Sequence, residues 1–140
     1  MLPSRPTNGA TVSVLVADDD DGYRHAVRQT LESWNLGVVE AGDGLEAWRL
    51  LEQDRSIHLA IVNWLLPKLD GYCLCRRLYE YRRGEIGAVM MVGESFVQEV
   101  CRRLPDDGAV CLAKPFDGAQ LRRSLLSAGW MLARVGGPAA

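Results

Sequence analysis

The sequence predicts an α/β fold in which a five-stranded parallel β-sheet is covered by helices on both faces. Short apolar runs of strand length alternate with longer segments whose apolar residues recur at helical spacing. The short runs are apolar at consecutive positions, which is typical of parallel strands buried on both faces. The chain has 140 residues without an internal repeat or linker, so all five strand–helix units fit one domain with a single core.

The first half of the chain is expected to supply three strands and two helices. A strand at Val12–Ala17 precedes a helix at Asp20–Trp34, in which Tyr23 and Val27 belong to the apolar set at helical spacing. The next predicted elements are a strand at Gly37–Ala41, a turn at Gly42-Asp-Gly44, a helix at Leu45–Gln53 and a strand at Leu59–Asn63.

The second half repeats the alternation. A loop holding Pro67 and Gly71 leads to a predicted helix over 72–81, and the fourth strand is expected at Ala88–Val92. A short helix at Phe96–Leu104 ends at Pro105, because proline cannot continue a helix. The remaining elements are a strand at Val110–Ala113 and a helix from about Gly118 whose core-facing residues are Leu121, Leu125, Ala128 and Leu132.

The termini and the bulk composition set limits on the kind of protein. Residues 1–11 are expected to be a disordered leader, 12–133 the folded domain and 134–140 a flexible tail. The net charge of −2 gives no reason to expect nucleic acid or a membrane surface as a partner, and no apolar run has the ~20 residues of a membrane span. We expect a soluble, cytoplasmic protein.

The four cysteines have no spacing typical of a metal or redox motif. Cys73, Cys75, Cys101 and Cys111 form no CxxC pair, and the histidines are isolated. We therefore expect four reduced, buried cysteines that pack as small apolar residues.

Chemically informative residues follow four of the predicted strands. Asp18 and Asp19 come after the first, Asn63 ends the third, Gly93 follows the fourth, and Lys114 follows the fifth. In a parallel α/β sheet the ligand crevice lies beyond the carboxyl ends of the strands, so these residues are expected to converge. Carboxylates with a lysine make a site for a divalent cation and a phosphoryl group, and only one other lysine, Lys68, occurs in the chain.

Four motifs in this order resemble a known family. They are Val14-Leu-Val-Ala-Asp18-Asp-Asp20, Glu40-Ala-Gly-Asp-Gly-Leu-Glu-Ala47, Trp64-Leu-Leu-Pro-Lys-Leu-Asp-Gly71 and Leu112-Ala-Lys-Pro-Phe116. From about Val12 to Leu126 the chain resembles the receiver domain of bacterial two-component response regulators. The resemblance implies a flavodoxin-like, doubly wound sheet with strand order 2-1-3-4-5.

The resemblance also implies roles for individual residues. In the family an aspartate at the end of the third strand accepts a phosphoryl group from a histidine kinase, an acidic pair holds Mg²⁺, and a lysine pairs with the phosphoryl oxygens. Asp18 and Asp19 match the acidic pair, and Lys114 matches the lysine. The Lys114–Pro115 bond is a candidate for the cis isomer, which only X-Pro bonds adopt at low cost.

Three positions depart from the family pattern. Asn63 stands at the phosphoacceptor, Gly93 at a position that the family fills with Thr or Ser, and Cys111 at the position of an aromatic residue that reorients on phosphorylation. If the fourth strand were shifted by two residues, Ser95 would supply the hydroxyl group instead. An amide is not a nucleophile and carries no charge for Mg²⁺, so we expect weak or absent metal binding at Asp18 and Asp19 and no other cofactor.

These departures predict an atypical receiver, or pseudo-receiver, in phosphorelay signalling that is not an enzyme and acts by protein–protein interaction. Its expected partner is a histidine kinase, an output protein or a second copy of the chain. One alternative is a conventional phospho-accepting receiver carrying an Asp-to-Asn substitution. Another is a haloacid-dehalogenase-like phosphatase, because Asp19-Asp20-Asp21-Gly22 after an apolar strand superficially offers that family's nucleophile and acid.

Apolar residues on the last two helices define a candidate interaction face. Leu126 and Trp130 lie four residues apart on a second flank of the last helix. Together with Phe96, Val97 and Val100 they form either an exposed patch or part of the core. The resemblance implies dimerisation or output through a face made of the fourth helix, fifth strand and fifth helix.

Overall fold

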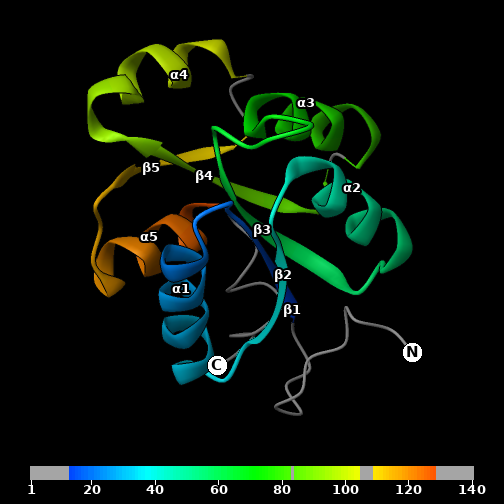
Figure 1. Cartoon of the computed structure of the whole chain (residues 1–140), viewed down its shortest axis with the longest axis horizontal. Coiled ribbons are helices and arrows are strands. Elements are labelled where there is room, and N and C mark those ends of the chain that lie inside the picture. Colours follow the sequence, from blue (N-terminus) through cyan, green and yellow to red (C-terminus); the bar gives the residue numbers. More distant parts are fainter. Residues whose placement is uncertain (1–12, 83, 105–108, 129–140) are drawn as a thin grey trace.

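The computed structural model describes residues 13–82, 84–104 and 109–128 (Figure 1). Its strands are β1 (Ser13–Ala17), β2 (Gly37–Ala41), β3 (Ile57–Asn63), β4 (Gly87–Gly93) and β5 (Val110–Lys114). Its helical elements are α1 (Asp21–Ser33), α2 (Gly44–Gln53), α3 (Gly71–Tyr81), the short 3₁₀ turn η1 (Glu94–Phe96), α4 (Val97–Arg103) and α5 (Gly118–Ser127). The expected leader and tail lie outside the described residues.

All neighbouring strands pair in parallel, and their order is β2-β1-β3-β4-β5. The predicted fold class and strand order are therefore confirmed. The predicted short helix at Phe96–Leu104 is present as α4, one residue shorter at each end, and η1 precedes it. Within the part of the chain that the structure describes, no helix is both long enough and apolar enough to cross a membrane.

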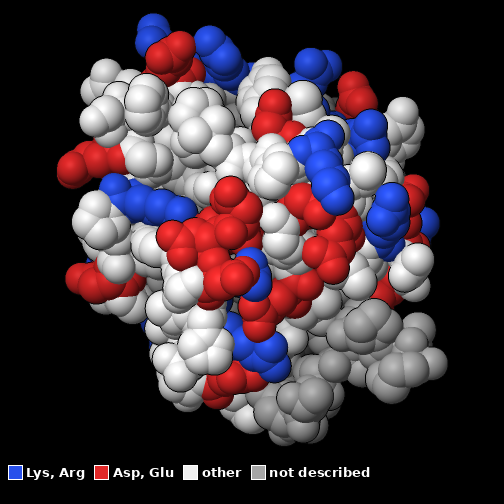
Figure 2. All heavy atoms as spheres, in the orientation of Figure 1, with Lys and Arg blue, Asp and Glu red and all other residues white. Residues whose placement is uncertain are grey.

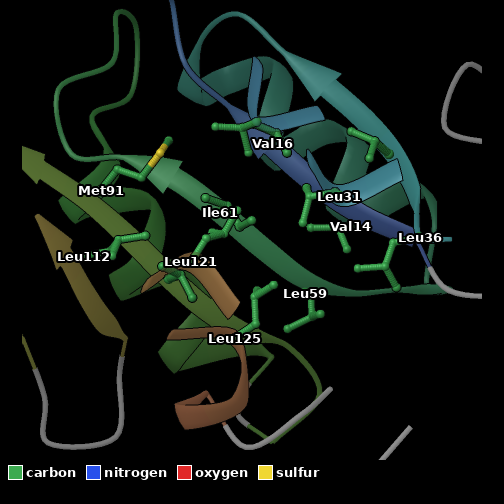
Figure 3. Packing of buried hydrophobic residues seen from close by; sticks show 13 residues of the cluster. Val14, Val16, Leu31, Leu36, Leu59, Ile61, Met91, Leu112, Leu121 and Leu125 are labelled. Atoms are coloured by element: carbon green, nitrogen blue, oxygen red, sulfur yellow. The ribbon is translucent and has the colours of Figure 1, made fainter. Parts of the chain in front are cut away.

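Alternate side chains of each strand enter different layers of the core. On β1, Val14 and Val16 pack with Leu31 of α1 and Leu125 of α5 (Figure 3). Leu15 and Ala17 point to the opposite face, where they pack in a cluster with residues of α2 and α3. Burying a side chain the size of Leu or Val stabilises the fold by roughly 1.5–3 kcal/mol. This two-sided burial explains why the strands read as continuous apolar runs.

Four of the helices begin with an aspartate that caps the helix N-terminus. Asp20, Asp43, Asp70 and Asp117 each accept a hydrogen bond from the backbone N–H three residues later, at 2.7–3.0 Å. Such a cap contributes about 1 kcal/mol by satisfying a helix donor that has no partner within the helix. Helix α4 differs, because no side chain makes this hydrogen bond at its N-terminus.

Two glycines allow the loop between β3 and α3 to lie close to its surroundings. A Cβ atom on Gly44 would overlap the carbonyl oxygen of Leu69, and one on Gly71 would overlap the carbonyl oxygen of Asn63. The Gly44 N–H donates to the Pro67 carbonyl at 3.1 Å. This close approach fixes the loop that follows Asn63 against the start of α2.

The structure corrects the expectation of four buried, reduced cysteines. Cys101 of α4 and Cys111 of β5 form a disulfide, and Cys73 is exposed. Only Cys75 is a buried free thiol, and its burial raises its pKa to about 12. The pair was missed because sequence spacing does not show that α4 folds back against β5, which brings the two Cα atoms to 6.3 Å, within disulfide range.

Candidate functional site

The parallel strands bring Asp18, Asn63, Gly93 and Lys114 to the same end of the sheet, where the carboxyl ends of the strands lie. Asn63, Gly93 and Lys114 are the last residues of β3, β4 and β5, and Asp18 directly follows β1. The register places Ala17 opposite Val62, so Asp18 and Asn63 follow at one level. Asn63 is opposite Met91, so Gly93 and its neighbour Lys114 lie two residues further along the strands. Figure 2 shows acidic side chains gathered in the middle of one molecular face, over the connection between β1 and α1.

Asp18 and Lys114 form a largely buried ion pair at this end of the sheet. The Lys114 Nζ donates to Asp18 Oδ2 at 2.8 Å, and the Asp18 side chain is only 1% exposed. The other carboxylate oxygen, Oδ1, accepts the Asp20 N–H at 3.0 Å. Both oxygens of the buried carboxylate thus have a donor, as a buried charge requires.

An aromatic pair holds Lys114 from its other side. The ammonium lies 4.0 Å from the centre of the Tyr23 ring, and Tyr23 meets Phe116 edge-on with ring centres 5.7 Å apart. A cation over an aromatic face is attracted to the ring electrons. Burial raises the pKa of the Tyr23 phenol above its usual value, and the charge of Asp18 adds to this effect. Tyr23 therefore stays neutral beside the ion pair.

The amide nitrogen of Asn63 binds the loop that follows it. Its Nδ2 donates to the Leu65 carbonyl oxygen at 2.8 Å, in the loop that leads to α3. This hydrogen bond ties the amide nitrogen to the backbone of the loop. Asp19 is exposed, and among the described residues its side chain makes no contact with Lys114.

The family model of the response regulator receiver domain matches residues 14–126. The chain belongs to this family. This assignment does not support the alternative of a haloacid-dehalogenase-like phosphatase, because the strand-end aspartates are part of the receiver match. Receiver domains are signalling modules of two-component systems.

Curated relatives of this receiver domain include bacterial and plant proteins. It is 30% identical over 118 residues to the chemotaxis protein CheY1 of Helicobacter pylori, covering 81% of this chain and 94% of CheY1. It is 32% identical over 108 residues to the transcriptional regulatory protein CseB of Streptomyces coelicolor, covering 77% of this chain and 45% of CseB. It is also 30% identical over 114 residues to the two-component response regulator-like APRR7 of Arabidopsis thaliana, covering 80% of this chain and 16% of the length of APRR7. It thus spans less than half of these two longer relatives.

Solved receiver structures share the fold. A response regulator receiver protein from Pseudomonas putida has a TM-score of 0.71 at 27% identity, over 85% of this chain and 98% of that one. The receiver domain of the sensor histidine kinase PA1611 of Pseudomonas aeruginosa has a TM-score of 0.73 at 25% identity, over 86% and 99%. That structure contains a magnesium ion in its active site cleft.

The oxygen donors of the present receiver domain fit a magnesium ion only weakly. Asp18 and Asp19 supply two carboxylates, but Asp18 is already paired with Lys114. Asn63 supplies an uncharged amide oxygen. Among the described residues, no three His, Cys, Asp or Glu side chains lie together as a metal-binding cluster. Since Mg²⁺ favours several oxygen ligands that include anionic ones, a weakly held and largely hydrated ion fits this set.

Gly93 and Cys111 lie where the strand assignment predicted. Gly93 is the last residue of β4, and Ser95 belongs to η1 rather than to the strand. A register shifted by two residues, which would have put Ser95 at the strand end, is therefore wrong. Cys111 pairs with Met90 across β4 and β5 and is bonded to Cys101. The Lys114–Pro115 peptide bond is cis.

The residues of the candidate interaction face do not form one exposed patch. Val100 is buried and, with the half-buried Val97, packs on the sheet face that carries α4. Leu126 packs in the core cluster of α1 and α5, on the opposite face. Phe96 is 48% exposed, and its ring lies tilted against that of Trp64, with ring centres 5.5 Å apart. Trp130 lies outside the described residues. Core packing is thus the correct alternative for Val100.

Sequence reasoning missed an arginine network beside the crevice. Arg24 donates to the Asp18 carbonyl oxygen and to Glu40, each at 2.6 Å, and Arg28 also donates to Glu40. Burial opposes ionisation of Glu40, but hydrogen bonds from Arg28 and Arg24 outweigh it and hold the pKa of Glu40 below its usual value. The sequence signal for this network was the spacing of Arg24 and Arg28, which lie one helical turn apart in α1, together with Glu40 in the next strand.

Proposed function

We propose that this receiver domain acts in two-component signalling by binding a protein partner, without forming an aspartyl phosphate at position 63. The observation behind the proposal is the amide side chain of Asn63 at the carboxyl end of β3. A carboxylate at this position would attack a phosphoryl group, whereas the amide nitrogen and oxygen of asparagine are not nucleophiles of this kind. A histidine kinase, an output protein or a second copy of the chain would be the partner.

The remaining crevice residues support the proposal. Lys114 is engaged by Asp18 and by the Tyr23 ring, so its charge is compensated without a phosphoryl group. Gly93 offers no hydroxyl group to a phosphoryl oxygen. Cys111 has no ring to reorient, and its sulfur is bonded to α4. The acceptor, the sensing group and the reorienting group of the family are thus all replaced in this chain.

Mg²⁺ would have a minor role in such a domain. Asp18, Asp19 and the amide oxygen of Asn63 would hold the ion, which would supply positive charge for phosphoryl oxygens. To bind the ion, Asp18 would have to share its carboxylate between the ion and Lys114. This competition is the reason that we expect weak binding.

Replacing Asn63 by aspartate is expected to tighten Mg²⁺ binding by about tenfold or more, because a contacting charge in a partly buried site contributes more than about 1.4 kcal/mol. Tryptophan fluorescence during a Mg²⁺ titration measures this, since Trp64 directly follows position 63. Asn35→Asp is the matched control, as it adds the same charge in the loop between α1 and β2. Equal affinities of native chain and Asn63→Asp would contradict the proposed role of the amide.

Beryllofluoride with Mg²⁺ separates this function from that of a conventional receiver with one substituted residue. The native chain is expected to show no fluorescence change beyond that of Mg²⁺ alone. The Asn63→Asp variant is expected to respond weakly, because Gly93 still offers no hydroxyl group. A full response of Asn63→Asp alone would favour the conventional receiver, in which the rest of the site is intact.

A further inference from the structure

The disulfide between Cys101 and Cys111 joins α4 to β5. Cys101 lies in the C-terminal half of α4, Cys111 is the second residue of β5, and the sequence separation is 10. Both side chains are only partly buried. The bond therefore connects a helix to the edge strand of the sheet at a place that solvent reaches.

Noncovalent contacts hold α4 less firmly than they hold α2 and α3. Only Val100 of its seven residues is buried, whereas α2 and α3 each bury four residues. No side chain caps its N-terminus. The half-buried Val97 packs beside Val100, and the Tyr72 hydroxyl donates to the Arg103 carbonyl at 2.9 Å. The position of α4 on the sheet consequently depends on the covalent bond more than that of its neighbours does.

A dissolved reagent can approach Cys111. The residue lines an open groove of about 390 Å³ along β5 and α5, whose lining includes Glu94, Gln120 and Arg123. Arg123, which lines the same groove, supplies positive charge of the kind that favours a reactive thiolate. The free thiol of Cys75 differs, because it is fully enclosed in the core and stays protonated.

We propose that Cys101 and Cys111 form a reversible dithiol–disulfide site whose reaction partner is a low-molecular-weight disulfide of the glutathione type, and whose state sets how firmly α4 is held on β5. The Cys111 thiolate attacks the reagent disulfide and releases one thiolate. The Cys101 thiolate then attacks the Cys111 sulfur of the mixed disulfide and releases the second. The two protons lost by the cysteines end on the two reagent thiols, and the two electrons reduce the reagent disulfide.

This inference goes beyond the proposed function and does not depend on it. Phosphorylation would take place at position 63, the last residue of β3, whereas the thiol chemistry takes place between Cys101 of α4 and Cys111 of β5. A chain that accepted a phosphoryl group would leave the redox site unaffected. A chain without redox behaviour would leave the phosphorylation-independent function unaffected.

Thiol mapping tests the chemical step. The full chain is equilibrated with mixtures of reduced and oxidised glutathione, quenched with acid, alkylated and digested. As the share of oxidised glutathione rises, the alkylated fractions of Cys101 and Cys111 are expected to fall together. When the quenched chain is denatured before alkylation, Cys73 and Cys75 are expected to be alkylated in every mixture. In Cys101→Ser, a mixed disulfide with glutathione is expected to accumulate at Cys111. Alkylation of both cysteines at every mixture would overturn the inference.

Hydrogen exchange tests the conformational consequence. Reduction of the native chain is expected to raise amide exchange in α4 by at least about tenfold and to leave α2 unchanged. Cys111→Ser is expected to match the reduced native chain under all conditions, and Cys73→Ser to keep the full redox response. Exchange in α4 that is the same before and after reduction would show that the disulfide does not hold the helix. Since this comparison uses the native chain, it does not require any variant to fold.

Discussion

Replacing Lys114 by methionine is expected to lower the free energy of unfolding by about 3–5 kcal/mol, since it leaves the carboxylate of Asp18 charged and buried without its partner. Asp18 is 1% exposed, and the Asp20 N–H alone would remain as its described donor. The contact with the Tyr23 ring would also be lost. Denaturant unfolding at neutral pH measures the loss.

Lys68→Met is the matched control, because Lys68 is the only other lysine in the sequence. Its ammonium lies 3.6 Å from Asp43 and its side chain is 64% exposed, so the same substitution is expected to change stability by less than about 1 kcal/mol. Similar effects of the two substitutions would contradict the expectation that the buried Asp18–Lys114 pair contributes more to stability than an exposed pair does.

Replacing Gly44 or Gly71 by alanine is expected to destabilise the fold by about 3 kcal/mol or more. In both cases the new methyl group would overlap a backbone carbonyl, of Leu69 or of Asn63, rather than a side chain that can rotate away. The loop after Asn63 would have to move, so the environment of Trp64 should change as well. Thermal unfolding and tryptophan emission measure the two effects.

Gly22→Ala separates this steric effect from the general effect of removing a glycine. Gly22 lies in α1, and a Cβ atom there would meet its nearest neighbour at 3.5 Å, an ordinary contact. Alanine is favoured over glycine in a helix by up to about 1 kcal/mol, so this variant is expected to be slightly more stable. Destabilisation of Gly22→Ala as large as that of Gly44→Ala would show that contact with the loop is not the cause.

The fold was predictable because local pattern and burial agree in nearly every element. Strands β1, β3 and β4 are buried on both faces and therefore read as apolar runs, whereas β5 at the sheet edge buries only Leu112. Each of the four capped helices starts at an aspartate. Helix α4 was predicted less accurately. With seven residues it spans about two turns, so periodicity did not show which side of it faces the sheet. Val100 was consequently left open between the core and an exposed face.

The positions of the site residues were predictable, but their contacts were not. Parallel strands place Asp18, Asn63 and Lys114 at one edge whatever their rotamers are. Which group each side chain bonds depends on side-chain rotation over distances of a few ångströms. The sequence therefore did not show that Asn63 donates to Leu65 or that Lys114 lies over Tyr23. The Cys101–Cys111 bond was missed for a related reason, since it depends on how α4 folds back onto β5.

We propose that this receiver domain is not phosphorylated at the carboxyl ends of its strands. Intact-mass spectrometry after incubation with acetyl phosphate and Mg²⁺ tests it most directly, with an Asn63→Asp/Gly93→Thr variant that regains both the nucleophile and the hydroxyl group as the comparison. The native chain is predicted to keep its mass while the variant gains a phosphoryl group. A hydroxylamine-labile phosphoryl adduct on a carboxylate of the native chain, whether Asp18, Asp19 or another, would contradict the account.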